Sequence, residues 1–179
     1  MMLVCLLLTG CRKQDSQMQQ ALDFRTRLLE AEGCQFSCTV RADYGERAYD
    51  FSLDCSYDGE DGKLTVTAPE NIAGITAIVD GDDASLEFDG LSLQYGELAN
   101  GHIAPLTIPW LLGSTWAEDY ISLVGTEEEQ TRITYLKGHH EEEITIDTWL
   151  RDTIPVCAEI SYDGHRVLTI YIDNFVFTK

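Results

Sequence analysis

The sequence predicts a mainly β fold of the α+β class: a curved antiparallel half-barrel sheet of about ten short strands, with two helices on its concave face. Three observations lead to this prediction. Apolar residues recur at helical spacing near the N-terminus, and apolar and polar residues alternate through most of the remaining chain. One almost entirely apolar segment in the middle of the chain interrupts that alternation.

The first helix is predicted between Ser16 and Gly33. Ser16 is a favourable N-cap residue, and Gly33 suits the C′ position that follows a helix. Between them, apolar side chains recur at a spacing that places them on one side of a helix: Met18, Ala21, Leu22, Leu28 and Leu29. We therefore expect an amphipathic helix that uses this stripe for packing.

A β-hairpin is predicted directly after this helix. Apolar and polar residues alternate over 34–44 and again over 49–57, and Gly45-Glu46-Arg47 lies between the two runs. Such alternation puts one face of an antiparallel hairpin against the core and leaves the other in solvent.

The alternating pattern continues to the C-terminus in short strands. Asp-Gly pairs such as Asp80-Gly81 and Asp163-Gly164 lie between them and favour tight turns. The further predicted strands are 64–67, 75–79, 86–88, 91–95, 133–135, 144–146, 155–162 and 166–172. With the hairpin they make about ten strands, mostly in meander order.

The segment 103–116 is almost entirely apolar and predicts a short helix on the covered face of the sheet. Pro109 suits the first turn of this helix, and Gly113 suits its end. The segment is too short to span a membrane as a helix. A curved sheet with helices on its concave face can enclose an apolar cavity.

The first eleven residues resemble the lipobox signal of bacterial lipoproteins. Residues 1–8 form a short apolar run, and the small residues Thr9 and Gly10 lead to Cys11. The resemblance implies cleavage before Cys11, attachment of a diacylglyceryl group to its thiol, and anchoring to the outer side of a membrane. The alternative is a buried N-terminal strand with an ordinary core cysteine.

This interpretation divides the chain into a signal peptide (1–10), a lipidated cysteine with a short tether (11–15) and a single domain (16–179). A signal peptide normally begins with a basic segment, whereas the first basic residue here is Arg12. We therefore expect that the signal peptide is truncated at its start.

Four cysteines lie beyond the predicted signal, and an even number in an exported protein permits disulfides. Cys34 and Cys38 lie in one strand, about 13 Å apart at ~3.3 Å per residue, and cannot bond to each other. A four-residue hairpin loop from Gly45 to Ala48 would place Cys38 directly opposite Cys55, which makes these two the disulfide candidates. A second bridge from Cys34 to Cys157, or free buried thiols, are the alternatives.

Composition and charge argue against several classes of function. The net charge of -19 lacks the basic face that nucleic-acid binding requires. No nucleophile, dinucleotide or phosphate-loop motif is present, so we expect no enzyme, cofactor or catalytic residue. The clusters 80–83 and 139–143 are better explained as polar turns than as metal sites, so no metal is expected.

The order of segments resembles the LolA-like family of lipoprotein carriers and related lipid-carrier lipoproteins. The resemblance spans about 16–177 and is a pattern rather than a catalytic signature. The stretches that carry it are the first helix with its two alternating strands, Pro69 to Gly74 with Ile75-Thr76-Ala77, Phe88-Asp89-Gly90-Leu91, the apolar insert, Pro155 to Val167, and Asp173 to Phe177. It implies a half-barrel whose helices cap a cavity for acyl chains.

The resemblance thus implies an extracytoplasmic, membrane-anchored lipoprotein that binds an acyl chain or lipid. The side chains that would line its cavity are Phe36, Phe51, Leu53, Leu93, Trp110 and Leu111. Ordinary core packing is the alternative for all six. The alternative function is a non-enzymatic interaction or structural module of the cell envelope, with a filled core and an acidic face that binds an unidentified protein or cell-wall partner.

Overall fold

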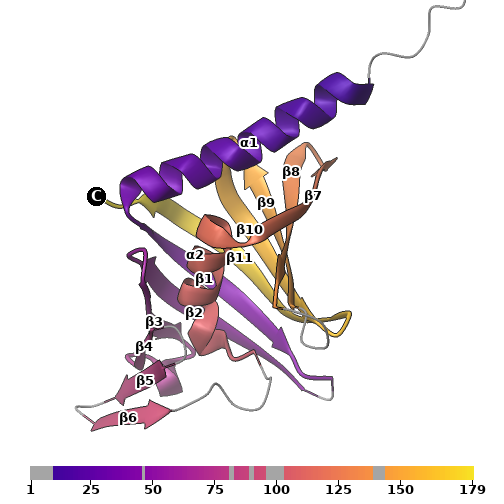
Figure 1. Ribbon diagram of the computed structural model, residues 1–179. Helices are drawn as coiled ribbons and strands as arrows, with labels where there is room; N and C mark the ends of the chain where they lie inside the picture. Colours follow the sequence, from indigo (N-terminus) through magenta and orange to yellow (C-terminus); the bar gives the residue numbers. More distant parts are fainter. Residues whose placement is uncertain (1–9, 46, 81–82, 89–90, 96–102, 139–143) are drawn as a thin grey trace, which may run out of the picture.

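The computed structural model describes residues 10–45, 47–80, 83–88, 91–95, 103–138 and 144–179. In these ranges, eleven strands form one antiparallel sheet in the order β6-β5-β4-β3-β2-β1-β11-β10-β9-β8-β7. The sheet curves around α2, and α1 crosses over one end of it (Figure 1). The predicted fold class is confirmed, with eleven strands in place of about ten.

Strands that are consecutive in the chain pair with each other, except β6 and β7, which form the two edges of the open sheet; β1 pairs with β11 in its middle. The strands are β1 (Cys34–Asp43), β2 (Ala48–Tyr57), β3 (Asp61–Ala68), β4 (Thr76–Asp80), β5 (Asp83–Phe88), β6 (Leu91–Tyr95), β7 (Tyr120–Glu127), β8 (Gln130–Lys137), β9 (Ile144–Arg151), β10 (Ile154–Tyr162) and β11 (His165–Phe177).

The additional strand is β7, which lies at one edge of the sheet. Val124 is its only buried residue, whereas Tyr120 and Leu123 are exposed. A strand that buries so little carries a weak alternation signal, which explains why the sequence pattern did not reveal it.

Helix α1 (Gly10–Ala31) begins six residues before the predicted start at Ser16. At its end the left-handed residue is Glu32, with φ 65°, and not the predicted Gly33. Gly33 is needed for space instead, because a Cβ there would lie 2.1 Å from the carbonyl oxygen of Tyr57. Residues 11–15, predicted as a tether, are helical.

The face of α1 that packs is rotated from the predicted stripe. Within the predicted stripe, Ala21 and Leu28 are buried, whereas Met18, Leu22 and Leu29 are exposed; Phe24, which lay outside the stripe, is buried. Phe24 directs this choice, because its ring meets Trp116 of α2 edge-on, with the ring centroids 5.5 Å apart.

The apolar insert forms the 3-10 turn η3 (Pro105–Thr107) and then α2 (Ile108–Glu118). A second 3-10 turn, η1 (Glu70–Ile72), precedes β4. The predicted helix end at Gly113 is wrong, because α2 continues for five residues beyond it. Gly113 instead packs on Tyr57 of β2, whose Cγ would lie 2.2 Å from a Cβ at this position.

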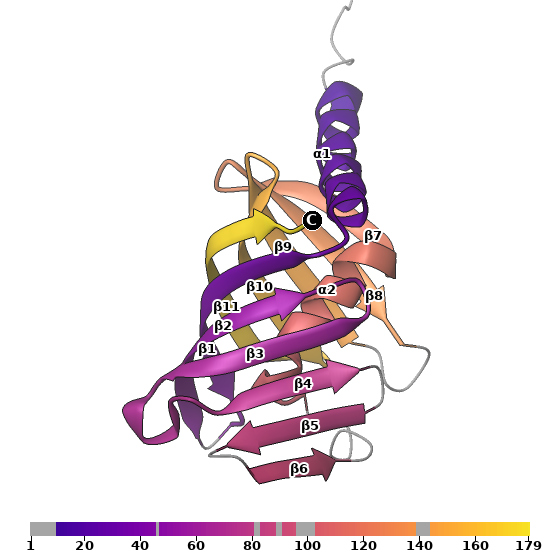
Figure 2. The same cartoon turned by 90° about the vertical axis from the view of Figure 1, so that its left-hand side faces the viewer.

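A second glycine makes the matching close contact from the sheet. A Cβ at Gly62 of β3 would lie 2.3 Å from the backbone nitrogen of Trp110 in α2. Helix α2 therefore rests directly on the backbone of β3, between the two halves of the curved sheet (Figure 2). This contact holds α2 against the concave face, where a cavity was expected.

The first hairpin has a register two residues from the predicted one. Cys38 lies opposite Leu53, and Cys55 lies opposite Phe36, so Cys38 and Cys55 are diagonal rather than direct neighbours. The cause is a loop over 44–47 in place of 45–48: the backbone amide of Tyr44 donates to the carbonyl of Arg47 at 2.9 Å. A shift of two residues keeps both thiols on the concave face.

No helix in the described ranges is both long and apolar enough to cross a lipid bilayer.

Candidate functional site

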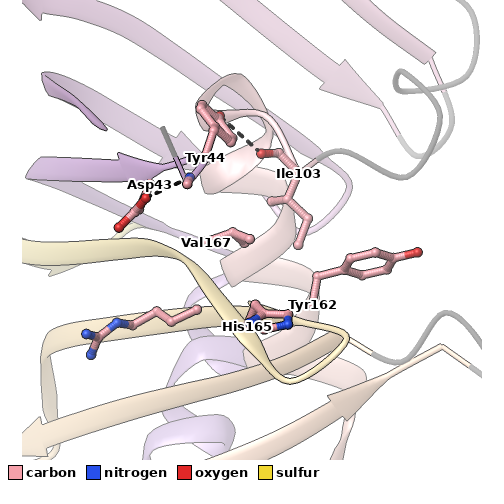
Figure 3. A pocket seen from close by; sticks show the side chains of 8 residues that line it. Asp43, Tyr44, Ile103, Tyr162, His165 and Val167 are labelled. Atoms are coloured by element: carbon pink, nitrogen blue, oxygen red, sulfur yellow. Dashed lines mark hydrogen bonds between the residues drawn. The ribbon is translucent and has the colours of Figure 1, made fainter. Parts of the chain in front are cut away.

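A pocket of about 490 Å³ opens at the end of the half-barrel away from α1 (Figure 3). Three segments that are distant in sequence build it: the β1–β2 turn, the residue Ile103 before η3, and the β10–β11 turn. The residues that line it are Asp43, Tyr44, Gly45, Ile103, Tyr162, His165, Arg166 and Val167. Its volume is within the roughly 300–1,000 Å³ that small-molecule pockets occupy.

Apolar side chains form the centre of the pocket. Ile103 and Val167 face one another there, and Tyr44 and Tyr162 lie on either side of them (Figure 3). Tyr44 remains 45% exposed, so its ring presents apolar surface to whatever enters. Aromatic rings with one polar end suit a boundary between an apolar ligand and water.

An aromatic row extends the pocket along β2. The rings of Tyr44 and Tyr49 have centroids 6.3 Å apart, and those of Tyr49 and Phe51 lie 6.4 Å apart in a stacked arrangement. Tyr49 is 42% exposed, although it shares the face of β2 that buries Leu53. The concave face therefore changes from a packed core to open aromatic surface at this row.

The polar groups of the pocket are at its rim. The Tyr44 hydroxyl donates to the carbonyl oxygen of Ile103 over 3.5 Å, and the Asp43 carboxylate accepts from the backbone amide of Gly45 at 2.9 Å. Partial burial, and then the neighbouring Tyr49, raise the pKa of Tyr44, so this hydroxyl stays protonated. Arg166 is held by Glu159 at 2.6 Å.

The predicted cavity residues lie elsewhere. Phe36, Leu53 and Leu111 are buried in the core, and Trp110 is partly buried beneath the Lys137 ammonium, 5.2 Å from its ring centroid. Phe51 touches the pocket only through Tyr49. The side chain of Leu93 lies outside the described part of the structure.

Aromatic packing fills the interior between the sheet and α1. Phe36 stacks on Phe175, with centroids 6.2 Å apart, and Trp116 meets Phe175 edge-on at 6.0 Å. The indole of Trp116 also donates to Thr148 of β9 at 3.0 Å. These contacts attach α2 to both halves of the sheet.

The four described cysteines are free thiols. The sulfurs of Cys38 and Cys55 lie 3.9 Å apart on the concave face, and Cys34 is buried near them. The contact with the Cys38 thiol, and then burial, raise the pKa of Cys55. The Cys38–Cys55 disulfide therefore stays a prediction, with the two sulfurs already neighbours.

Sequence reasoning missed the pocket because its parts come from three places in the chain. Tyr44 and Tyr49 were assigned to the covered face of their strands, but alternation does not show where that cover ends. Tyr162 was assigned to the end of the predicted strand 155–162, and His165 to the turn that follows it. An aromatic pair flanking a hairpin loop was the available signal.

Three other predicted features fall outside the described side chains. These are Cys11, the cluster 80–83 and the cluster 139–143. Within the described ranges, no group of three or more histidine, cysteine, aspartate or glutamate residues is arranged to hold a metal ion.

The fold is similar to that of solved LolA superfamily proteins, which confirms the predicted resemblance at the level of fold. A LolA superfamily protein from Nitrosomonas europaea is 9% identical, with a TM-score of 0.50, and the match covers 93% of this chain and 94% of that one. A putative outer membrane lipoprotein-sorting protein domain from Vibrio parahaemolyticus is 7% identical, with a TM-score of 0.50 and coverage of 92% and 93%. No protein-family model and no curated protein matches the chain.

Proposed function

We propose that the protein is a membrane-anchored, extracytoplasmic lipoprotein that binds the acyl chain of an amphiphile in the pocket at the open end of the half-barrel. The observation that carries this proposal is the pocket itself, with its apolar centre and exposed aromatic row. Each methylene that leaves water there contributes about 0.8 kcal/mol.

The rim fits the other end of an amphiphile. The Tyr44 hydroxyl, the Asp43 carboxylate and His165 provide both hydrogen-bond donors and acceptors beside the apolar centre. An acyl chain would lie against Ile103 and the row from Tyr44 to Phe51, while its head group would stay near these polar groups and solvent.

Two further observations support the location and the anchor. The order of residues before Cys11 resembles a lipobox, and a protein of the same fold is described as a putative outer membrane lipoprotein-sorting protein. Cys11 lies in the first turn of α1, so lipidation there would place this helix directly at the bilayer surface.

A second candidate function is the non-enzymatic interaction module. The burial of Phe36, Leu53 and Leu111 favours it, because these side chains belong to the packed core between α2 and the sheet. In this function the protein would use its acidic surface to bind a partner in the cell envelope. The two functions use different surfaces and are compatible with each other.

Calorimetric titration of palmitate into the full chain carrying Cys11→Ser tests the acyl site. We expect saturable binding that Tyr49→Ala weakens about tenfold, since the lost ring removes stacking and apolar contact. Tyr171→Ala, which removes an exposed ring on the opposite face, is the matched control and should leave palmitate binding unchanged. Equal loss in both variants, or no binding by the parent chain, would rule out the acyl site.

A further inference from the structure

A second groove, of about 530 Å³, lies on the convex face of the sheet. Trp149, Cys157 and Tyr171 are direct cross-strand neighbours on β9, β10 and β11, and all three line it. The residues that follow or precede them, Thr148, Ala158 and Ile170, are completely buried, so the row faces away from the helices. We call this site the outer groove.

The outer groove combines aromatic rings with carboxylates. Tyr171 is 57% exposed, and Asp173 follows two residues later on the same face of β11. Glu128 and Glu159 are also in the lining. Glu159 is paired with Arg166, whereas Glu128 and Asp173 have no ion-pair or hydrogen-bond partner among the described residues.

The chain itself shows what such a combination binds. Beside the outer groove, the Arg132 guanidinium lies over the ring of Trp149, 5.1 Å from its centroid. The same guanidinium donates to Asp147 at 3.1 and 2.8 Å and to Glu127 at 3.2 Å. A planar cation thus uses an aromatic face and two carboxylates together.

Tyr171 offers a second combination of this kind. Its ring has no cation over it among the described residues. Asp173 and Glu128 line the same groove without an ion-pair partner in the described ranges, and Arg151 is the one cation in the lining, so carboxylates outnumber cations there. Cys157 lies between the rings of Trp149 and Tyr171 at the base of the groove. Burial, and then the neighbouring Glu159, raise the pKa of its thiol to about 11, so the base of the groove is uncharged at neutral pH.

We propose that the outer groove is a docking site for an arginine-bearing basic segment of a protein partner. The occupant is chosen by charge complementarity to a chain of net charge -19 and by the residue types present, since tyrosine, tryptophan and arginine dominate the energetics of protein interfaces. The proposal locates the partner surface of the interaction-module function and does not depend on acyl binding.

The test is fluorescence anisotropy of fluorescein-labelled hexa-arginine titrated with the full chain carrying Cys11→Ser. We expect Tyr171→Ala, and separately the pair Glu128→Gln with Asp173→Asn, to weaken binding about tenfold. Hexa-lysine should bind more weakly than hexa-arginine, because an ammonium lacks the planar face for stacking.

Matched controls separate the groove from general attraction to an acidic protein. The pair Asp54→Asn with Asp163→Asn removes two exposed carboxylates outside the groove and should change affinity by less than about twofold. Tyr49→Ala should weaken palmitate binding but not peptide binding, so failure of one proposal can be told from failure of the other.

Two results would overturn the proposal. If groove and control variants lose peptide affinity equally, the attraction is that of the whole negative surface. The groove is a carbohydrate site if triacetylchitotriose binds, if Tyr171→Ala abolishes that binding, and if the same variant leaves the affinity for hexa-arginine unchanged.

Discussion

Two glycines determine how closely α2 approaches the sheet. Gly62 of β3 meets the backbone of Trp110, and Gly113 of α2 meets the ring of Tyr57. Neither has a positive φ, so the missing side chain matters for space and not for backbone freedom. The sequence offered Gly113 as a helix end because glycine is common there, and only the packing shows its different role.

The variant Gly62→Ala should destabilise the fold by about 1–3 kcal/mol, because the new methyl group can fit only if the backbone of α2 moves. Urea denaturation measures this change. Gly125→Ala on the edge strand β7, where a Cβ has nothing within 4 Å, is the matched control and should change stability by less than about 0.5 kcal/mol. Equal effects would mean that α2 does not rest on β3.

Burial raises the pKa of the Cys34 thiol from 9.0 to about 12. A thiol with a raised folded-state pKa contributes stability that is complete below the unfolded pKa and is lost as the pH rises through the folded one. The reduced protein should therefore lose stability between about pH 9 and about pH 12. Cys157, whose pKa is raised to about 11, contributes in the same direction.

Urea denaturation of the reduced protein at about pH 8 and about pH 11 tests this dependence. Cys34→Ala should show a smaller loss of stability between the two pH values than the parent chain. Cys157→Ala should remove less of the loss than Cys34→Ala does. An unchanged pH dependence in Cys34→Ala would contradict the assignment of the effect to this thiol.

At the scale of elements, Arg25 supplies the polar contact between α1 and α2, beside the ring contact of Phe24 with Trp116. Arg25 of α1 donates to the carbonyl oxygens of Trp116 and Asp119 at the end of α2, at 2.8 and 2.6 Å. A cation at the C-terminus of a helix satisfies its free carbonyls and complements its dipole. Lys137 of β8 completes the joint through an ion pair with Asp119 at 3.1 Å.

Replacing this cation should weaken the fold measurably. Arg25→Ala is expected to lower the free energy of unfolding by about 1.5–3 kcal/mol, the range for hydrogen bonds that involve a charged group. Arg47→Ala, at an exposed loop position, should cost less than about 0.5 kcal/mol. A similar small cost for both would show that the contact between α1 and α2 does not depend on Arg25.

Most elements could be predicted from the sequence, because strands with one buried face alternate clearly. The exceptions have physical reasons. β7 buries only Val124, and the packing face of α1 includes Gln17 and Phe24, which the apolar spacing did not select. The hairpin register depends on where the loop begins. Alternation cannot determine it, because a shift of two residues leaves every side chain on the same face.

At the scale of the whole molecule, the negative charge and the predicted anchor oppose each other. A net charge of -19 disfavours contact with an anionic bilayer, so the proposed attachment depends on the predicted lipid on Cys11. The basic residues of α1 would reduce the repulsion between this helix and an anionic bilayer. The helix carries four of the twelve basic residues: Arg12, Lys13, Arg25 and Arg27.

Lipidation can be tested in a bacterial host fed an alkyne-labelled fatty acid, with a complete basic segment placed before residue 1. We expect label incorporation and partition into the detergent phase for the parent chain. Both should be lost in Cys11→Ala and retained in Cys5→Ala. Labelling that survives Cys11→Ala would contradict the lipobox assignment.

The binding site was less predictable than the fold. Apolar periodicity identified Phe36, Leu53 and Leu111 as covered, but it does not distinguish side chains that line a cavity from those that fill it. The pocket appears only once the β1–β2 turn, Ile103 and the β10–β11 turn come together, over more than 100 residues of chain.

The most direct test of this account is photocrosslinking with a diazirine-bearing palmitic acid, followed by mapping of the modified residues by mass spectrometry. Acyl binding in the pocket predicts adducts on Tyr44, Ile103, Tyr162 and Val167, at the open end of the half-barrel. Adducts concentrated on Phe36, Leu53 or Leu111 would show that the interior opens to admit the ligand and would contradict it.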